Sequence, residues 1–205
     1  MRSQVKRVFF GRYAFYVLRE VYEPAEDTFL SARNLNVKEG ERVLDMGTGC
    51  GILAVLAAER AKKVVAVDVN PHAASCAKKN AESNGVGAKV ETRVGDLFEA
   101  IADDEKFDLI LFNAPYLPVE KDEGASWIEK AWAGGKTGRK VIDRFIDTAP
   151  HYLAEKGRVL LVQSSLSNVE KTLKRLSQKK LHATIIGEET VVFEKIVLIG
   201  AQKTS

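Results

Sequence analysis

The chain has 205 residues, of which 45% are hydrophobic and 29% are charged, a balance that fits one globular domain with a hydrophobic core. No apolar run approaches the roughly 20 residues that cross a bilayer, and no apolar signal-peptide segment follows the basic N-terminus, so neither a membrane span nor secretion is expected. The net charge of +3 is typical of a slightly basic surface and gives only weak support to a nucleic-acid partner.

The N-terminal segment reads as an extension that precedes the main domain. Residues 5–22 alternate in polarity and are rich in aromatic side chains, which predicts a short hairpin. Residues 23–35 follow, with Pro24 where helices begin and acidic residues in the first turn, which predicts a helix. We therefore expect residues 1–35 to form an N-terminal cover of a hairpin and a helix, and residues 36–205 to form the main domain.

From Arg42 onward, strands alternate with helices. Strands are predicted at 42–46, 63–69, 88–94, 107–113, 157–163, 182–189 and 194–201, and helices at 51–61, 71–84, 138–153 and 168–180. This alternation indicates an α/β fold with a seven-stranded, mostly parallel sheet and helices on both faces. A short loop joins the last two strands, so one strand is expected to be antiparallel, since a parallel pair needs a long crossover.

A glycine-rich turn, "LDMGTGCG", joins the first strand of the main domain to its helix. Gly47 and Gly49, with Thr48 between them, let the backbone turn tightly and approach a ligand closely. The G-x-G-x-G spacing differs from the G-x-G-x-x-G of dinucleotide-binding dehydrogenases. Asp45 precedes the first glycine, where a carboxylate would repel a pyrophosphate and suit a cationic ligand.

Two further acidic residues follow the next two strands of the predicted sheet. Asp68 ends the second strand, where a carboxylate can accept hydrogen bonds from both ribose hydroxyls. Asp96 follows the third strand, where it could accept from an adenine amino group while Leu97 offers its backbone N–H. Each acid alone is equally well explained as a strand-end cap. With Asp45 they predict a site for a nucleoside with a cationic amino-acid tail, which S-adenosyl-L-methionine fits.

The fourth strand ends in "FNAPYLP", which places Asn113 beside the predicted position of a cofactor methyl group. An amide nitrogen is a poor nucleophile, so an enzyme that methylates one must hold it about 3–3.5 Å from the methyl carbon and in line with it. The Asn113 side-chain oxygen and the Ala114 carbonyl are two acceptors for such an NH₂ group. Pro115 stiffens the turn, and the Tyr116 ring offers a flat face to a planar amide or base.

Four segments together carry a resemblance to a known family. They are "VYEPAEDTFL" at 21–30, "LDMGTGCGILA" at 44–54, "FNAPYLP" at 112–118 and "AWAGGKTGRKVIDRF" at 131–145. The chain resembles class I S-adenosylmethionine-dependent methyltransferases with a Rossmann-like fold and a "[DNS]PP[YF]" motif. It is most similar to the short HemK-like branch of archaea and eukaryotes, which methylates the glutamine of the GGQ motif in class 1 translation release factors.

The resemblance implies residue roles and partners. Thr28 and its neighbours would fold over the cofactor, and Asn113, Pro115 and Tyr116 would hold the substrate amide; Asp45, Gly47, Asp68, Asp96 and Asn113 would bind the cofactor. A class 1 release factor would be the substrate, and a small zinc-binding activator subunit a partner that pairs with an exposed sheet edge. Ala114 stands where the family usually has proline, a change that removes rigidity and keeps the backbone carbonyl.

Two other functions compete with this hypothesis. A nucleic-acid amino methyltransferase would hold adenine N6 or guanine N2 in the same turn, with Tyr116 stacked on the base. A cofactor-binding scaffold without activity would not need Asn113 and Tyr116.

Two other features of the sequence carry no predicted site. "AGGKTG" at 133–138 looks like a phosphate-binding loop but lacks the required earlier glycine and does not follow a strand. Cys50 and Cys76 have no metal-type spacing, so no metal site is expected and a cytoplasmic setting is the default.

Overall fold

The computed structural model describes residues 5–120 and 126–203. The chain begins with an antiparallel hairpin of β1 (Lys6–Phe10) and β2 (Tyr13–Val17), as the alternating pattern predicts. Helix α1 (Glu26–Arg33) follows, with two acidic residues in its first turn. The hairpin is tied to the main domain because Asn80 on α3 (Pro71–Ser83) accepts from the Tyr16 N–H at 2.9 Å and donates to the Tyr16 carbonyl at 2.8 Å.

The main sheet has seven strands in the order β5-β4-β3-β6-β7-β9-β8. β9 pairs antiparallel with both of its neighbours, and the other pairs of the sheet are parallel, which confirms the predicted mostly parallel sheet with one antiparallel strand. The bounds are β3 (Arg42–Met46), β4 (Lys63–Asp68), β5 (Val90–Val94), β6 (Phe107–Asn113), β7 (Leu153–Ser164), β8 (Leu181–Val191) and β9 (Glu194–Lys203).

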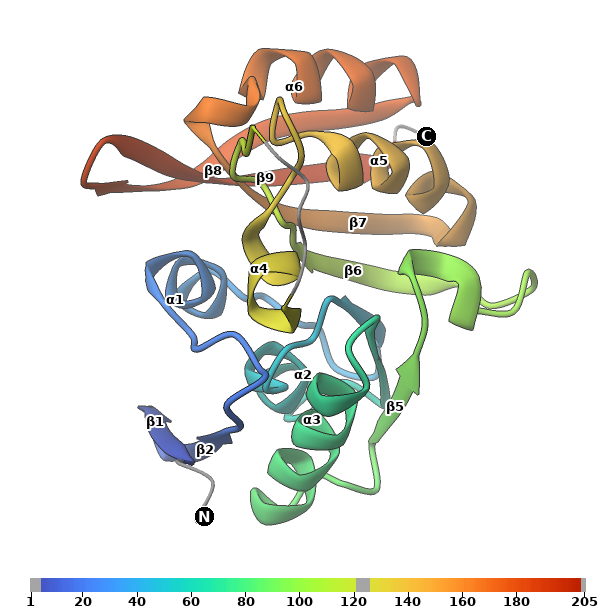
Figure 1. Ribbon diagram of the computed structural model, residues 1–205. Coiled ribbons are helices and arrows are strands. Elements are labelled where there is room, and N and C mark those ends of the chain that lie inside the picture. Colours follow the sequence, from blue (N-terminus) through green and yellow to red (C-terminus); the bar gives the residue numbers. More distant parts are fainter. Residues whose placement is uncertain (1–4, 121–125, 204–205) are drawn as a thin grey trace.

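Helices cover both faces of this sheet (Figure 1). α1, α2 (Ile52–Ala57) and α3 lie on one side of the sheet, and α5 (Lys140–Tyr152) and α6 (Val169–Gln178) lie on the other. The central strands are apolar and almost fully buried, as expected for parallel strands covered on both faces. This packing fixes the carboxyl ends of β3 and β6 side by side, with Asp45 opposite Leu111 in the register.

The helix boundaries follow local signals in the sequence. α3 has Pro71 at its first position, and the Asn70 side chain caps it by accepting from the His72 N–H at 2.9 Å. α6 is capped by Asn168, whose side chain accepts from the Lys171 N–H at 2.9 Å. Short 3₁₀ turns, η1 (Leu97–Ala100) and η2 (Ser165–Ser167), follow β5 and β7.

Three elements differ most from the sequence prediction, one of them α2, which was predicted at 51–61 and ends at Ala57. A short helix, α4 (Trp127–Trp132), was not predicted, although Ser126 and Glu129 form a capping box whose S-x-x-E pattern is visible in the sequence. β7 begins at Leu153 rather than at residue 157. α5 ends at Tyr152, one residue before the predicted end at 153, and β7 follows it directly. Within the described ranges, no helix is both long and apolar enough to span a membrane.

Candidate active site

A cavity of about 570 Å³ opens where β3, β4, β5 and β6 end. Ligands of open parallel sheets bind at these carboxyl ends because the loops that follow the strands diverge there. The cavity is lined by every residue that the sequence assigns to the cofactor, namely Thr28, Asp45, Gly47, Thr48, Gly49, Asp68, Asp96, Leu97 and Asn113. The fold therefore brings together residues that are far apart in the sequence, such as Thr28 on α1 and Asn113 at the end of β6, which are 85 positions apart.

The glycine-rich turn forms the floor of the cavity. Gly47 and Gly49 have φ angles of 65° and 58°, in the left-handed region that glycine adopts without strain. A Cβ on Gly47 would lie 3.4 Å from the Phe112 ring, so the turn packs closely against the end of β6. Thr48 fixes the turn, because its N–H donates to the Val67 carbonyl at 3.0 Å and its hydroxyl donates to Asp45 at 2.6 Å.

One buried and one half-buried carboxyl group, those of Asp45 and Asp68, face the cavity. Burial raises the pKa of Asp45 to about 7, and the neighbouring charge of Asp68 acts in the same direction. Burial also raises the pKa of Asp68, although its two oxygens accept from the N–H groups of Gly49 and Asn70, each at 2.9 Å. Each of these oxygens has a lone pair left for a further donor. Two desolvated acids in one cavity favour a ligand that brings hydroxyl donors and positive charge.

Asp96 lies at the cavity rim and has a partner that the sequence did not suggest. Arg144 on α5 donates to its two carboxylate oxygens at 3.3 and 3.0 Å. Leu97, next in the chain, adopts a φ of 51°, a conformation that non-glycine residues rarely take. Arg144 also lines the cavity, so a base bound near Asp96 would lie beside a guanidinium group as well as a carboxylate.

Asn113, the last residue of β6, is held in one orientation. Its side-chain NH₂ donates to Asp27 at 3.0 Å and to the Thr28 hydroxyl at 3.3 Å. Its side-chain oxygen is buried and receives no hydrogen bond from any residue that the structure describes. A buried acceptor without a donor costs about 1–3 kcal/mol, so this oxygen is suited to receive a donor from a bound substrate.

Of the other residues of this turn, one lines the cavity and two are buried. Pro115 lines the cavity with Asn113, whereas Ala114 and Tyr116 are almost fully buried and are not among the described residues that line it. The Tyr116 hydroxyl donates to Asp27 at 3.0 Å, and burial followed by the charge of Asp27 raises the pKa of this phenol. The structure therefore places the Tyr116 ring behind the turn rather than across the cavity.

The segment 132–139 supports this turn from behind. Leu117 donates to the Trp132 carbonyl at 2.9 Å and accepts from the Gly134 N–H at 2.8 Å, forming a short parallel bridge. The segment follows helix α4 and not a strand, which agrees with the rejection of a phosphate-binding loop. Gly138 packs so closely that a Cβ built on it would lie 2.1 Å from the Tyr116 carbonyl oxygen.

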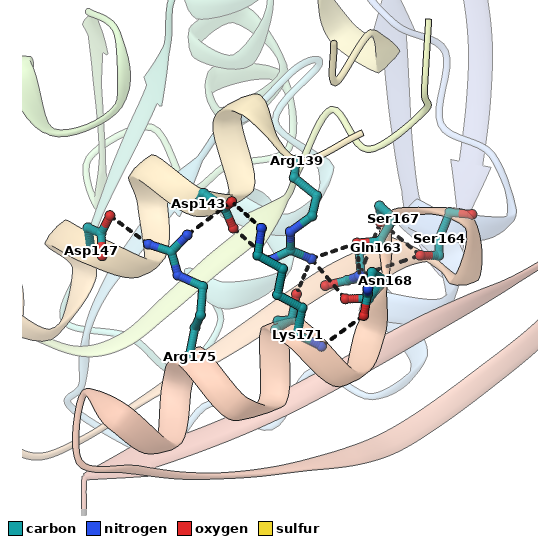
Figure 2. A network of polar contacts seen from close by, with 10 residues as sticks. Arg139, Asp143, Asp147, Gln163, Ser164, Ser167, Asn168, Lys171 and Arg175 are labelled. Atoms are coloured by element: carbon teal, nitrogen blue, oxygen red, sulfur yellow. Dashed lines mark hydrogen bonds and ion pairs between the residues drawn. The ribbon is translucent and has the colours of Figure 1, made fainter. Parts of the chain in front are cut away.

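Arg139 anchors this support to α6 and α5 (Figure 2). The side chain is almost fully buried and donates to the Ser167 carbonyl at 2.6 Å, the Asn168 carbonyl at 2.8 Å and Asp143 at 2.6 Å. The network ties the start of α5 to the start of α6 at the point where Gly138 meets the turn. The backbone of the turn is thereby held without a proline at position 114.

Gly138→Ala is expected to lower the free energy of unfolding by more than about 3 kcal/mol, because a left-handed φ of 69° is combined with a clash against backbone. Gly40→Ala is the matched control, since Gly40 has a φ of 78° and no atom within 4 Å of the added Cβ, so about 1 kcal/mol of strain is expected there. Urea denaturation measures both. Equal losses in the two variants would show that the close approach to Tyr116 contributes nothing.

Several cavity residues were missed from the sequence. Tyr22 and Pro24 reach the cavity from the segment before α1, and Trp127, Lys130 and Arg144 reach it from α4 and α5. Asp27 does not line the cavity but accepts a hydrogen bond from Asn113. It was also missed, although it stands directly before Thr28 within "VYEPAEDTFL". Local patterns mark strand ends and glycine turns, but they do not show which helix lies against the cavity.

Comparison with known proteins agrees with this geometry. The methyltransferase small domain family matches residues 25–186. A putative protein N5-glutamine methyltransferase of Methanocaldococcus jannaschii is 42% identical over 89% of this chain and 91% of its own length. Methyltransferase HEMK2 of Homo sapiens is 36% identical over 88% of this chain and 90% of its own.

A solved structure is similar over almost the same length. It is that of the E. cuniculi Mtq2–Trm112 complex, described as responsible for methylation of the eRF1 translation termination factor. The likeness has a TM-score of 0.71 at 26% identity and covers 90% of this chain and 99% of that chain. The family match, the two relatives and the sheet topology lead to one assignment: the chain belongs to the methyltransferase small domain family and is a HemK-like methyltransferase with a Rossmann-like class I fold.

Proposed function

We propose that this methyltransferase transfers a methyl group from S-adenosyl-L-methionine to the side-chain amide of the GGQ glutamine of a class 1 translation release factor. The observation that carries the proposal is the buried, unpartnered Asn113 side-chain oxygen at the end of β6, beside a cavity that contains two desolvated acids. The names of the relatives support the reaction type, and the description of the Mtq2–Trm112 complex supports a release factor as the acceptor.

The residues present fit S-adenosyl-L-methionine, which supplies an electrophilic methyl group when bound. Asp45, which lines the cavity, would balance the ammonium group of the amino-acid tail with its carboxylate. Asp68 would accept from the ribose hydroxyls through the lone pairs that Gly49 and Asn70 leave free. Asp96 would accept from the adenine amino group, with the Leu97 N–H beside it.

The acceptor amide would be held by the turn at the end of β6. The Asn113 side-chain oxygen and the Ala114 carbonyl accept hydrogen bonds from the NH₂ group and so orient its nitrogen toward the methyl carbon. These acceptors also stabilise the positive charge that develops on the nitrogen during transfer. Pro115 restricts the backbone before it, and Tyr116 contributes by fixing the turn from behind through its hydrogen bond to Asp27.

Binding of S-adenosyl-L-methionine is expected to strengthen as pH rises through about 7. Burial raises the pKa of Asp45 to about 7, so the carboxyl is largely protonated below that pH and attracts the ammonium group less. Calorimetry should show Kd falling several-fold between about pH 6 and pH 7.5. Asp45→Asn should bind more weakly, and its Kd should lack this slope.

The same pKa predicts how stability depends on pH without the cofactor. The folded protein holds the Asp45 proton more tightly than the unfolded chain, so this contribution is full below about pH 4 and is lost as pH rises through about 7. The wild-type Tm, measured relative to that of Asp45→Asn, should fall over this window. A difference that stays constant from about pH 5 to pH 8 would contradict the assignment of a buried, protonated Asp45.

The proposal includes two further assignments. Residues 1–35 would act as a cover over the cofactor, which is supported by the position of Tyr22, Pro24 and Thr28 on the cavity wall. A cytoplasmic location follows from a release factor as substrate.

We also propose a partner subunit, which the family resemblance implies to be a small zinc-binding activator; the Mtq2–Trm112 complex supports a second chain. It would pair with an edge strand of the sheet, either β5, where Val94 is exposed, or β8, where Ile186 is exposed.

Mass spectrometry of a class 1 release factor after incubation with the enzyme and cofactor tests the function. We expect a gain of one methylene, about 14 Da, on the peptide that contains the GGQ motif. A factor with the glutamine changed to alanine is the control for the site. Methylation of RNA in a parallel reaction, with the factor left unmodified, would instead support the amino methyltransferase of nucleic acids that the sequence left open.

A further inference from the structure

Five hydrogen bonds converge on Asp27, a buried acid in the first turn of α1. One carboxylate oxygen accepts from Asn113 at 3.0 Å, from the Tyr116 hydroxyl at 3.0 Å and from the Tyr22 hydroxyl at 3.3 Å. The other accepts from the N–H and hydroxyl of Thr28 at 2.6 and 3.1 Å. Thr28 and Asn113 line the cavity, whereas Asp27 is not among the described residues that do.

This arrangement decides which end of the Asn113 amide faces the substrate. The two ends of an amide have nearly the same shape, so packing alone does not distinguish them. A carboxylate only accepts hydrogen bonds, and therefore only the NH₂ end can face Asp27. The Thr28 hydroxyl gives its proton to Asp27, which leaves it as a second acceptor for the same NH₂ group at 3.3 Å. The Asn113 oxygen must then point away from both, and it is the atom that the structure leaves buried without a donor.

The charge of Asp27 also acts on that oxygen. Donation from the NH₂ group to a carboxylate shifts electron density along the amide toward its oxygen, because linked hydrogen bonds polarise one another. A more negative oxygen is a stronger acceptor for an NH₂ group that becomes positive as it is methylated. The interaction is weakly screened, since both Asp27 and the Asn113 oxygen are buried.

We propose that Asp27 is a positioning residue for methyl transfer: through its bond to Asn113 it turns the amide oxygen toward the acceptor and increases the negative charge on it. The inference rests on the proposed function, because it assumes that the acceptor is an NH₂ group held by Asn113. It assigns to α1 a part in the reaction beyond covering the cofactor.

Asp27→Asn keeps the volume of the side chain and removes its charge. We expect kcat for the release factor to fall about 10²-fold, the loss that follows when a reacting group is displaced by about 1 Å. The Kd for S-adenosyl-L-methionine should stay within about two-fold, since Asp27 lies outside the cavity wall. Glu26→Gln is the matched control, as Glu26 is exposed one residue earlier in the same turn, and it should leave both values unchanged. A kcat close to that of the wild type in Asp27→Asn would overturn the proposal.

A charge swap separates positioning from a general loss of structure. Asn113→Asp places a second acid against Asp27 and should lower kcat at least as much as Asp27→Asn does. The double variant Asp27→Asn/Asn113→Asp restores one donor opposite one acceptor, and we expect kcat to recover about ten-fold over Asn113→Asp alone. If the loss of activation free energy in the double variant equalled the sum of the losses in the two single variants, a direct coupling would be contradicted.

A third measurement does not depend on activity. In the cofactor-free protein, the side-chain NH₂ resonances of Asn113, identified with Asn113→Ala, should exchange slowly with solvent and should lose this protection in Asp27→Asn. Rapid exchange in the wild type would overturn the positioning role of Asp27 and leave the proposed function standing. Wild-type enzyme that does not methylate the release factor, with slow exchange of this NH₂ group, would remove the proposed function and leave the Asp27–Asn113 bond standing.

Discussion

Asn113→Ala is expected to lower kcat for methylation of the release factor about 10³-fold while leaving the Kd for S-adenosyl-L-methionine within about three-fold. The side-chain oxygen is the buried acceptor that the structure leaves unpartnered, and its loss removes both orientation and charge stabilisation from the substrate NH₂ group. Pre-steady-state transfer from labelled cofactor measures the chemical step, and calorimetry measures cofactor binding.

Asn84→Ala serves as the matched control for this variant. Asn84 is also half-buried and well bonded, since its NH₂ group donates to the Ala14 carbonyl at 2.9 Å and the Asn80 carbonyl at 2.8 Å, but it ties α3 to β2 away from the cavity. It should lose stability and keep its activity at a temperature where it is folded. Normal single-turnover rates in Asn113→Ala would exclude Asn113 from the acceptor site.

The fold and the cofactor half of the site are largely predictable from sequence because both depend on local patterns. Alternating apolar strands and helices determine a parallel sheet, and the ends of its strands must meet at one edge. Asp45, Asp68 and Asp96 are therefore brought to one cavity by a rule that needs no knowledge of side-chain contacts. The hairpin of β8 and β9 was predictable for the same reason, because its loop is too short for a parallel connection.

The contacts between distant residues that orient the side chains of the site were not predictable from local patterns. Asn113 and Asp27 are 86 positions apart, and their contact depends on how α1 lies against the end of β6. Arg144 and Asp96 are 48 positions apart and meet because α5 passes over the turn after β5. Helix packing of this kind depends on side-chain shapes along the whole interface, which a hydrophobic pattern does not specify.

The Tyr116 ring is buried, whereas the sequence analysis expected it to offer a flat face to the substrate. The sequence places an aromatic ring beside the amide-binding turn, and a flat face for the substrate is the obvious role. The structure buries the ring and uses its hydroxyl to contact Asp27. Gly138 packs against the Tyr116 carbonyl oxygen, a close approach between distant segments that the sequence pattern does not show.

The family usually has proline at position 114, and contacts with the segment 132–139 explain how the turn stays rigid with alanine there. A proline at this position would limit the backbone by its ring, whereas here the turn is held by hydrogen bonds between Leu117 and the segment 132–134 and by the contact with Gly138. Tertiary structure therefore supplies rigidity, and alanine keeps the backbone carbonyl that the proposed function uses as an acceptor.

Asp68→Ala is expected to weaken binding of S-adenosyl-L-methionine about 10²-fold, because two hydrogen bonds from ribose hydroxyls to a carboxylate contribute about 3 kcal/mol together. The variant also leaves the N–H groups of Gly49 and Asn70 without their acceptor, which loosens the glycine-rich turn. Calorimetry with S-adenosylhomocysteine measures the loss without turnover, and kcat at saturating cofactor should fall much less than the affinity does.

The control for Asp68→Ala removes a similar cap from the opposite end of the sheet. Asp108 accepts from the Arg42 N–H at 2.8 Å near the start of β6, as Asp68 accepts from Gly49 near the end of β4. Asp108→Ala should lower stability by a comparable amount and leave cofactor affinity unchanged, since the two acids differ in which end of the strands they occupy. If both variants bound the cofactor as the wild type does, the Asp68 carboxylate would be only a strand-end cap, and the ribose would have to be held by another residue of the cavity.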